Sequence, residues 1–156
     1  MIKIINEDLL TANVDAIAHQ VNCMGVMGAG LAKQIRSRYV YVYDRYLRAC
    51  ELHHHSDLLG KVQTIKTVLP NEPYVINMFA QEFYGKDKRY TDYDALYTCL
   101  TKVKEFMLRN KLKTLGLPYG LGCGLAGGSW KIVYELIRDA FGDSDITIYI
   151  CKKEVM

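Results

Sequence analysis

Short apolar runs alternate with longer stretches of helical period along the whole chain. Because these runs are mostly apolar, they resemble strands buried on both faces rather than strands with one face in water. Helices interleaved with such strands predict an α/β fold, in which helices cover both faces of one sheet as a three-layer α/β/α sandwich. The six runs lie at Ile2–Ile5, Val14–Val21, Val62–Val68, Tyr74–Phe79, Thr114–Leu117 and Ile146–Cys151.

Two of the stretches between these runs have a clear helical pattern. In "TDYD", Thr91 and Asp94 have the spacing of a capping box, which predicts the start of the first helix. The second helix is expected to begin near Ser129 and to end at Gly142. Their apolar faces carry Leu96, Leu100, Val103 and Met107 in the first helix, and Ile132, Val133, Leu136, Ile137 and Ala140 in the second.

The stretch "YVYVYDRY", from Tyr39 to Tyr46, fits two kinds of element. Its alternating tyrosines have the period of a strand, whereas the continuation "DRYLRACELH" has the pattern of a helix. We expect a turn followed by a helix that begins at about Tyr43.

The length of 156 residues is that of one ordinary domain. The chain has no internal repeat, no low-complexity tract and no linker-like segment, which predicts a single domain over residues 1–156. No apolar run approaches the roughly 20 residues that a membrane helix needs. The segment "MIKIINEDLL" lacks the long apolar core of a secretion signal. We therefore expect a cytoplasmic protein with no membrane partner.

Neither the cysteines nor the histidines have the spacing of a metal site. The five cysteines are scattered and never spaced CxxC, which argues against a zinc cluster and against a disulfide framework. The adjacent residues His53, His54 and His55 point in different directions and have no fourth ligand at a suitable spacing, so a solvated helix end explains them better. We expect no metal and no cofactor. The net charge of +3 permits polyanionic partners without arguing for them.

Two glycine-rich segments each leave a strand and enter a helix: "VNCMGVMGAGLAKQI", residues 21–35, and "LPYGLGCGLAGGSW", residues 117–130. Glycine allows the chain to turn with positive φ and lets a ligand approach the backbone amides. The free N–H groups and the positive dipole end of the following helix favour an anion, for which phosphate is the natural candidate. If the two strands are neighbours, both loops emerge at one edge of the sheet and enclose a diphosphate. Taken singly, either loop can also be only a tight strand-to-helix turn.

Familiar phosphate motifs fit these loops poorly. The first loop has the glycine separation of a Walker motif, but Leu31 and Ala32 stand where Lys and Ser or Thr are required. Residues 122–127 match GxGxxG, yet a dinucleotide site also needs an acidic residue at the end of the next strand. The nearest one after that strand is Glu154. A dinucleotide-dependent oxidoreductase is therefore a disfavoured alternative.

Taken together, the two loops resemble those of the macro domain family, whose fold binds ADP-ribose. The segment "VDAIAHQVNCMGVMGAGLAKQI" resembles the second strand and first phosphate loop of that family, and "LPYGLGCGLAGGSW" resembles its second phosphate loop. The combination of "NCMGVMGAGLAK" with "GCGL" is most similar to one branch. That branch contains terminal ADP-ribose glycohydrolases, antitoxins that remove ADP-ribose from DNA, and fungal-type ADP-ribose 1″-phosphate phosphatases. The resemblance implies a mixed, mostly parallel six-stranded sheet.

The resemblance also implies a ligand, namely ADP-ribose or a 1″-substituted derivative, with ADP-ribosylated protein or nucleic acid as macromolecular partners. Asp15 would accept a hydrogen bond from the adenine amino group, with the Ile17 backbone contributing, although Asp15 can also be a solvated turn residue. Asn22 and the first loop would line the distal ribose and the diphosphate, and the second loop would close over the phosphates. The implied ligand-binding residues are Asp15, Ile17, Asn22, Gly25, Met27, Gly28, Ala29, Gly30, Leu31, Gln81, Tyr119, Gly122, Cys123, Gly124, Leu125, Ala126 and Gly127.

Two departures from the glycohydrolase branch bear on activity. Gln81 stands where that branch has a lysine after the fourth strand, and Ala126 stands where it has an acidic residue after "GCGL". A lysine nucleophile would have to come from Lys86 or Lys88, folded inward from the following loop. That loop, with Tyr84, Lys86 and Tyr90, is either a lid over the distal ribose or an exposed connection.

His19 matches a histidine that the phosphatase-like members carry four residues before the cysteine of the first loop. An imidazole with a pKa of about 6.5 can activate water or protonate a leaving oxygen. A lone histidine in an apolar strand can equally be a satisfied core residue. We therefore predict a hydrolase in which His19 is catalytic and which removes phosphate, or a macromolecular ester or base, from the distal ribose. The main alternative is a non-catalytic reader of ADP-ribose, which the missing lysine and acid favour.

Overall fold

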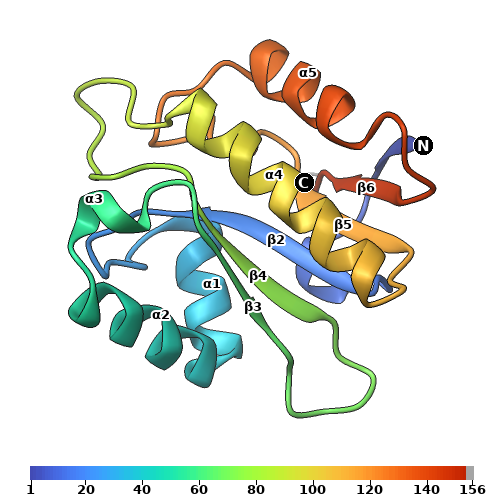
Figure 1. The fold of residues 1–156 in the computed structure, drawn as a ribbon, viewed down its shortest axis with the longest axis horizontal. Helices are drawn as coiled ribbons and strands as arrows, with labels where there is room; N and C mark the ends of the chain where they lie inside the picture. The colour runs from blue at the N-terminus through green and yellow to red at the C-terminus, as the bar shows by residue number, and fades with distance from the viewer. Residues whose placement is uncertain (154–156) are drawn as a thin grey trace.

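The computed structural model describes residues 1–153 and contains one six-stranded sheet in the order β1-β6-β5-β2-β4-β3 (Figure 1). Strand β3 pairs antiparallel with β4, and all other neighbours are parallel. The predicted mixed, mostly parallel sheet is therefore confirmed. No helix within residues 1–153 is long and apolar enough to cross a membrane. The strands are β1 (Ile2–Ile5), β2 (Ala16–Val21), β3 (Val62–Ile65), β4 (Tyr74–Phe79), β5 (Thr114–Pro118) and β6 (Thr147–Cys151).

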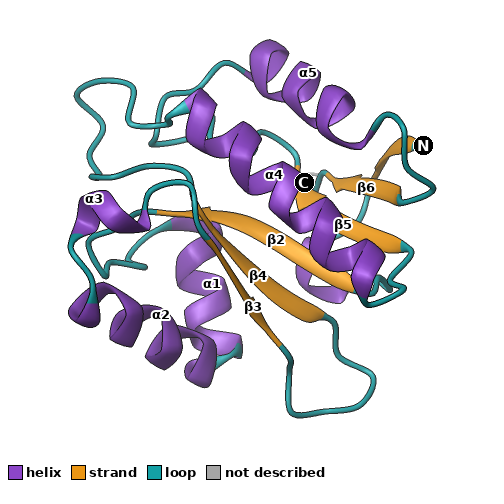
Figure 2. Ribbon diagram, viewed as in Figure 1, coloured by secondary structure: helices purple, strands orange, loops and turns teal. Residues whose placement is uncertain are grey.

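Helices cover both faces of the sheet, as the apolar strands require (Figure 2). Helices α4 (Tyr93–Arg109) and α5 (Trp130–Phe141) pack on one face, and α1 (Gly30–Arg38) and α2 (Val40–Leu52) lie on the other. Successive side chains of a strand point to opposite faces. Thus Ala18 of β2 joins the core under α4 and α5, whereas Ile17 joins the core under α1 and α2. The α/β/α sandwich is confirmed.

The expected capping box at the start of α4 is wrong. The N-cap is Asp92, whose carboxylate accepts a hydrogen bond from the Ala95 amide at 3.0 Å. The Thr91 hydroxyl is used elsewhere, since it donates to the Gly122 carbonyl at 2.6 Å. Helix α5 begins after Ser129 and ends at Gly142 as predicted, although the hydroxyl of Ser129 makes no capping bond.

Helix α2 begins at Val40, three residues before the predicted position of about Tyr43. Tyr41 and Tyr43 belong to the helix, and its buried face consists of Val42 and Tyr46, continued by Tyr39 at the N-cap. Three expected strands are also too long, since β2 begins at Ala16 instead of Val14, β3 ends at Ile65 instead of Val68, and β6 begins at Thr147 instead of Ile146. Two short elements were not predicted, the 3₁₀ helix η1 (Leu9–Thr11) and α3 (His55–Leu58).

The loops after β2 and β5 lie at the same edge of the sheet. The two strands are parallel neighbours, with Ala16 opposite Leu115 and Ile17 opposite Gly116. Both glycine-rich loops follow the carboxyl ends of these strands, where open α/β sheets bind their ligands. The neighbouring strands that a shared anion site requires are therefore present.

Candidate ligand-binding pocket

A pocket of about 530 Å³ lies between the two glycine-rich loops. Its floor is the carboxyl end of β2, and one wall consists of the first loop and the start of α1. The opposite wall consists of the second loop and the segment after β4. The lining residues are His19, Gln20, Val21, Asn22, Val26, Gly28, Ala29, Gly30, Leu31, Ala32, Gln81, Tyr84, Gly85, Lys86, Pro118, Tyr119, Gly120, Leu121, Gly122, Gly124, Leu125 and Ala126.

The first loop is held in shape by Asn22 and by Tyr46 of α2. Asn22 Oδ1 accepts a hydrogen bond from the Met24 amide at 3.0 Å, and its Nδ2 donates to the Val26 carbonyl at 2.8 Å. The fully buried Tyr46 hydroxyl donates to Asn22 and accepts from the Gly25 and Val26 amides, both at 3.1 Å. These bonds fix the loop, so the polar atoms of Asn22 organise the pocket wall.

The start of α1 presents backbone amides to the pocket. The first amides of any α-helix lack an intrahelical acceptor, and Ala29 at the N-cap has no side-chain oxygen to bind them. Gly30, Leu31 and Ala32 form this first turn, and all three line the pocket. Gly30 has φ +56°, a conformation that glycine adopts readily. Together with the helix dipole, these amides form a site for an anion.

The second loop approaches the pocket closely because Gly122 has no side chain. Gly122 has φ +71°, and a Cβ there would lie 2.9 Å from Gln20 Oε1 and 3.1 Å from Thr91 Oγ1. A Cβ on Gly128 would lie 2.6 Å from the Gly122 carbonyl oxygen. These glycines therefore serve packing within the loop as well as access to its backbone.

A network of side-chain hydrogen bonds joins the floor of the pocket to both parts of the opposite wall, the second loop and the segment after β4. Gln20 Nε2 donates to Gln81 Oε1 and to Thr91 Oγ1, both at 2.9 Å. The network ends on two backbone carbonyls, because Thr91 donates to Gly122 and Gln81 Nε2 donates to Phe83 at 2.9 Å. Gln20 Oε1 is buried and has no hydrogen-bond partner in the described part of the chain. The network leaves an acceptor at the pocket floor.

His19 is almost fully buried at the floor of the pocket, with 2% of its surface exposed. Its Nε2 lies 2.6 Å from Asn77 Oδ1 on the neighbouring strand β4. Burial disfavours the charged imidazolium and lowers the pKa of His19 from 6.5 to about 4, although the hydrogen bond with Asn77 acts in the opposite direction. The imidazole is therefore neutral at physiological pH.

The family model of the macro domain matches residues 18–137, which include both loops and the whole pocket floor. The chain belongs to the macro domain family. Among curated relatives, it is 29% identical over 147 residues to the DNA ADP-ribosyl glycohydrolase of Mycobacterium tuberculosis, a match that covers 91% of this chain and 40% of that protein. It is 25% identical over 158 residues to the ADP-ribose 1″-phosphate phosphatase of Saccharomyces cerevisiae, covering 85% and 88%.

The fold agrees with a solved macrodomain. The macrodomain of Mycobacterium tuberculosis DarG superposes with a TM-score of 0.83 at 27% identity, covering 97% of this chain and 99% of that one. This macro domain spans about two fifths of the length of the DNA ADP-ribosyl glycohydrolases that it matches.

Two of the residues expected to bind adenine lie at the wrong edge of the sheet. Asp15 precedes β2, and a strand rises about 3.3 Å per residue, so Asp15 is roughly 20 Å from Asn22 at the other end. Its carboxylate accepts hydrogen bonds from the Lys113 and Thr114 amides at 2.7 and 3.0 Å, which ties β2 to the start of β5. Ile17 lies near the same end of β2, where its backbone is part of the sheet and pairs with Val75 of β4 and Gly116 of β5. The expected contact of Asp15 and Ile17 with adenine is therefore wrong.

Four further residues of the expected set do not line the pocket. Met27 is buried against Tyr46 and Phe79, and Gly25 is held by the Tyr46 hydroxyl. Cys123 and Gly127 are also absent from the pocket lining, although their neighbours belong to it. A Cβ on Gly127 would meet the Arg89 backbone at 3.2 Å, so this glycine packs against the loop before α4.

The remaining expected residues do line one pocket, and the structure adds others to them. The twelve predicted lining residues are His19, Asn22, Gly28, Ala29, Gly30, Leu31, Gln81, Tyr119, Gly122, Gly124, Leu125 and Ala126. Sequence reasoning missed Gln20, which is polar in an otherwise apolar strand, and Tyr46, which supports the first loop from behind. The spacing of Tyr39, Val42 and Tyr46 was a usable signal for Tyr46, since such spacing is that of a buried helical face.

The segment after β4 forms part of the pocket wall. Tyr84, Gly85 and Lys86 line the pocket, whereas Lys88 lies over the Tyr90 ring with its Nζ 5.3 Å from the centroid. The Tyr90 hydroxyl donates to Asp87 at 2.6 Å. Of the residues considered for a lid, Tyr84 and Lys86 are thus at the pocket and Tyr90 is not.

The three consecutive histidines bind different partners at the end of α2. His53 Nδ1 lies 3.0 Å from the Ala49 carbonyl oxygen, His54 Nδ1 lies 2.7 Å from Ser56 Oγ, and His55 Nδ1 lies 2.5 Å from Glu82 Oε2. Within residues 1–153, no three His, Cys, Asp or Glu side chains are grouped so as to hold a metal ion.

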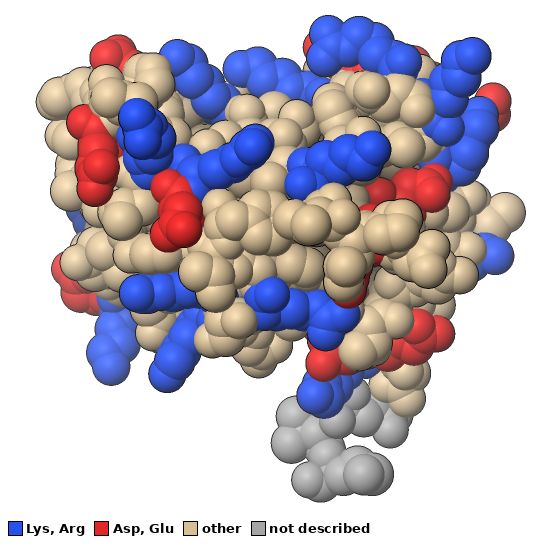
Figure 3. All heavy atoms as spheres, turned by 90° about the horizontal axis from the view of Figure 1, so that it is seen from below, with Lys and Arg blue, Asp and Glu red and all other residues tan. Residues whose placement is uncertain are grey.

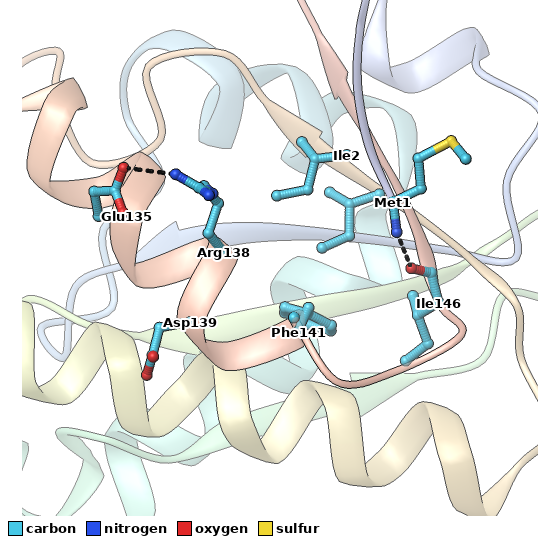
Figure 4. Close-up of a pocket in the computed structure, with 9 residues that line it drawn as sticks. Met1, Ile2, Glu135, Arg138, Asp139, Phe141 and Ile146 are labelled. Carbon is cyan, nitrogen blue, oxygen red and sulfur yellow. Dashed lines mark hydrogen bonds and ion pairs between the residues drawn. The ribbon is translucent and has the colours of Figure 1, made fainter.

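A second cavity, of about 450 Å³, lies at the opposite edge of the sheet, beside the end of α5 (Figure 4). Its charged groups already have hydrogen-bond partners, and that of Asp139 is Tyr97, outside the cavity. Arg138 lies 3.1 Å from Glu135, and the Met1 amino group donates to the Ile146 carbonyl at 3.4 Å. This cavity contains neither glycine loop, so it is a suitable reference region for binding experiments.

Proposed function

We propose that this macro domain binds ADP-ribose and hydrolyses the bond between its distal ribose and an attached group. The observation that carries the proposal is the convergence of two glycine loops, one of them at a helix start, on one pocket. Such an arrangement favours a doubly charged diphosphate. The names of the relatives support both parts of the proposal, because they include a DNA ADP-ribosyl glycohydrolase and an ADP-ribose 1″-phosphate phosphatase.

The adenine end requires a different acceptor from Asp15. Asp8 follows β1, whose carboxyl end lies at the same edge as the pocket. Its neighbour Leu9 packs in one buried cluster with Leu31 of the pocket wall. Asp8 Oδ1 accepts from the Leu10 amide at 3.0 Å and Oδ2 lies 3.2 Å from Lys153 Nζ, which lowers the pKa of Asp8 and keeps the carboxylate charged. Asp8 is thus the proposed acceptor for the adenine amino group.

Hydrolysis would use water as the nucleophile. For a 1″-phosphate, the oxygen of water bonds to phosphorus and gives up one proton, the bond from phosphorus to the ribose oxygen breaks, and that oxygen takes up a proton, so the protons balance. The amides of the two loops would stabilise the negative charge that develops on the phosphate oxygens. His19 is neutral and can accept a hydrogen bond from the attacking water, but its low pKa makes it a poor proton donor to the leaving oxygen.

A specific observation also favours a non-catalytic reader. The Gln81 amide is bound on both sides, to Gln20 and to the Phe83 carbonyl. Gln81 therefore fills a structural position where the glycohydrolase branch has its lysine, and Ala126 offers no carboxylate. Lys86 is the lysine that lines the pocket. Membership of the macro domain family supports the hydrolase and the reader over the oxidoreductase alternative.

The charge pattern on one face of the molecule does not select a macromolecular carrier. On the face drawn in Figure 3, basic and acidic side chains are interleaved, with wide uncharged areas between them. A nucleic-acid surface would show a continuous basic stripe instead. ADP-ribosylated protein and ADP-ribosylated nucleic acid both remain in the proposal, and the cytoplasmic location stays a prediction.

A substrate panel tests the proposal. The protein is incubated with ADP-ribose 1″-phosphate, with ADP-ribosylated protein and with an ADP-ribosylated DNA oligonucleotide, and the released product is measured. Binding of ADP-ribose, AMP and NAD is measured separately by calorimetry. Release from one substrate supports a hydrolase, and binding without release from any of them supports the reader. Tighter binding of NAD than of ADP-ribose would contradict both.

A further inference from the structure

A chain of side-chain hydrogen bonds runs from the pocket floor across the sheet to α2. His19 Nε2 lies 2.6 Å from Asn77 Oδ1, and Asn77 Nδ2 donates to Gln63 Oε1 at 3.0 Å. Gln63 Nε2 in turn donates to the Arg45 carbonyl oxygen at 3.0 Å. The chain thus passes from β2 through β4 and β3 to the backbone of α2.

The Arg45 carbonyl, at the end of this series of hydrogen bonds, determines the orientation of the Gln63 and Asn77 amides and the tautomer of His19. A backbone carbonyl can only accept, so Gln63 must present its NH₂ group to Arg45 and its oxygen to Asn77. Asn77 must therefore donate through Nδ2 to Gln63 and present its oxygen to His19. Since that oxygen can only accept, His19 Nε2 carries the proton. Asn77 is fully buried, so water does not offer it another arrangement.

This tautomer leaves a lone pair on His19 Nδ1. The atom is buried and has no hydrogen-bond partner in the described residues, although His19 lines the pocket. A buried acceptor without a partner is costly, and an O–H donor in the pocket would satisfy it. Burial also lowers the pKa of His19 to about 4, so Nδ1 stays unprotonated near neutral pH.

We propose that Asn77 and Gln63 are positioning residues that hold His19 in the Nε2–H tautomer, so that Nδ1 accepts a hydrogen bond from a hydroxyl group in the pocket. The donor is a ribose hydroxyl of the ligand or a water molecule beside it. This inference rests on the proposed function for the identity of the ligand. The tautomer itself is a property of the free protein and is tested without any ligand.

Long-range proton–nitrogen NMR on protein labelled with ¹⁵N-histidine reads the tautomer directly. For His19, we expect one species in the free protein, with a protonated Nε2 and an unprotonated Nδ1, unchanged from pH 6 to pH 8. A protonated Nδ1, a mixture of tautomers or an imidazolium ion at His19 would overturn the inference. Because no ligand is present, this result does not depend on whether ADP-ribose binds.

Adding ligands to the same sample distinguishes the two donors. If the Nδ1 resonance moves with ADP-ribose and not with AMP, which lacks the distal ribose, the donor is a hydroxyl of that ribose. If Nδ1 already has the shift of a hydrogen-bonded acceptor in the free protein, the donor is water. If ADP-ribose binds and Nδ1 shows no hydrogen bond in either state, the proposed acceptor role is wrong. Failure of ADP-ribose to bind at all contradicts the proposed function but not the tautomer.

Two matched variants at Gln63 test the positioning role. Gln63→Met removes the acceptor for Asn77 Nδ2, so the Asn77 amide is free to rotate and donate to His19 Nε2, which moves the proton to Nδ1. We expect mixed tautomers and an affinity for ADP-ribose lowered about fivefold, the size of one net hydrogen bond. Gln63→Glu keeps an oxygen for Asn77 and should keep the tautomer, although its carboxylate cannot replace the bond that Gln63 Nε2 donates to the Arg45 carbonyl. Identical histidine spectra in the two variants would show that Gln63 positions nothing.

Discussion

Tyr46 supports the first loop although it does not line the pocket. Its hydroxyl binds Asn22 and the amides of Gly25 and Val26, and all of these groups would lose a partner in Tyr46→Phe. Leaving buried polar groups unsatisfied costs about 1–3 kcal/mol. We expect a loss of stability of this size in denaturant unfolding and weaker ADP-ribose binding in calorimetry.

Tyr43→Phe is the matched control for this change. Tyr43 packs its ring against Arg36, whose guanidinium carbon lies 3.9 Å from the ring centroid, and phenylalanine keeps that ring. Equal stabilities and affinities in the two variants would show that the Tyr46 hydroxyl does not hold the loop.

His19 should make the stability of the protein depend on pH. Its pKa is about 4 in the folded protein, against an ordinary value of 6.5 for a solvated histidine, so the unfolded chain binds the additional proton between these values. Stability is therefore complete above pH 6.5 and falls by about 3 kcal/mol as the pH drops to 4. Urea unfolding at pH 7 and pH 4 measures the loss, and His19→Gln should show a smaller one. The same loss in both proteins would contradict the buried, neutral histidine.

The two aspartates at opposite sheet edges give opposite predictions. Asp8→Asn should weaken the binding of AMP, because Asp8 is the proposed acceptor for the adenine amino group. Asp15→Asn should leave AMP binding unchanged and lower stability, because the Asp15 carboxylate binds the Lys113 and Thr114 amides. Calorimetry measures the AMP affinity of both variants, and denaturant unfolding measures their stability. Weaker AMP binding in Asp15→Asn alone would restore the adenine contact expected from the sequence.

The loop glycines, Asp15 and His19 also show how much of the site can be predicted from the sequence. The glycines were predictable because positive φ and close approach are local requirements that few other residues meet. The position of Asp15 was predictable as well, because it lies at the start of the strand whose other end enters the first loop. The orientation of His19 depends on Asn77 and Gln63, which are distant in sequence and adjacent only through the pairing of β2, β4 and β3.

At the scale of elements, the start of α1 carries the proposed anion site, and Ala29 at its N-cap allows a test that separates folding from binding. An aspartate or asparagine at an N-cap stabilises a helix by about 1 kcal/mol relative to alanine. Ala29→Asp also places a negative charge where the diphosphate is proposed to bind. We expect Ala29→Asp to raise stability and to lower ADP-ribose affinity at least tenfold, as measured by unfolding and calorimetry.

Ala29→Asn has nearly the same shape and capping ability without the charge. It should gain stability and keep more of the affinity than Ala29→Asp. If both variants bind ADP-ribose equally well, the negative charge of the ligand does not lie at the start of α1.

Elements whose apolar residues follow a single period were predictable from the sequence, and elements whose residues fit two periods were not. Helix α4 follows from a single apolar face, and its residues are buried as expected. Helix α2 was placed too late because alternate tyrosines have a strand's period, while packing against the sheet selects the helical face of Tyr39, Val42 and Tyr46. The capping box failed because a tertiary contact, from Thr91 to Gly122, competes with the local one.

At the scale of the whole molecule, the fold follows from the alternation of apolar strands and amphipathic helices, because buried parallel strands need helices on both faces. The pocket follows from that topology, since β2 and β5 are parallel neighbours that release both loops at one edge. The second cavity, at the opposite edge, has no such loops, and its Arg138 guanidinium is paired with Glu135.

The central claim is that both loops bind the diphosphate of one ADP-ribose molecule, and amide NMR of uniformly ¹⁵N-labelled protein tests it most directly. On titration with ADP-ribose, we predict saturable shift changes in the backbone amides of residues 28–32 and 122–126 together, with one common affinity. Residues 135–142 beside the second cavity should not change. Shifts confined to one loop, or centred on residues 135–142, would contradict the account.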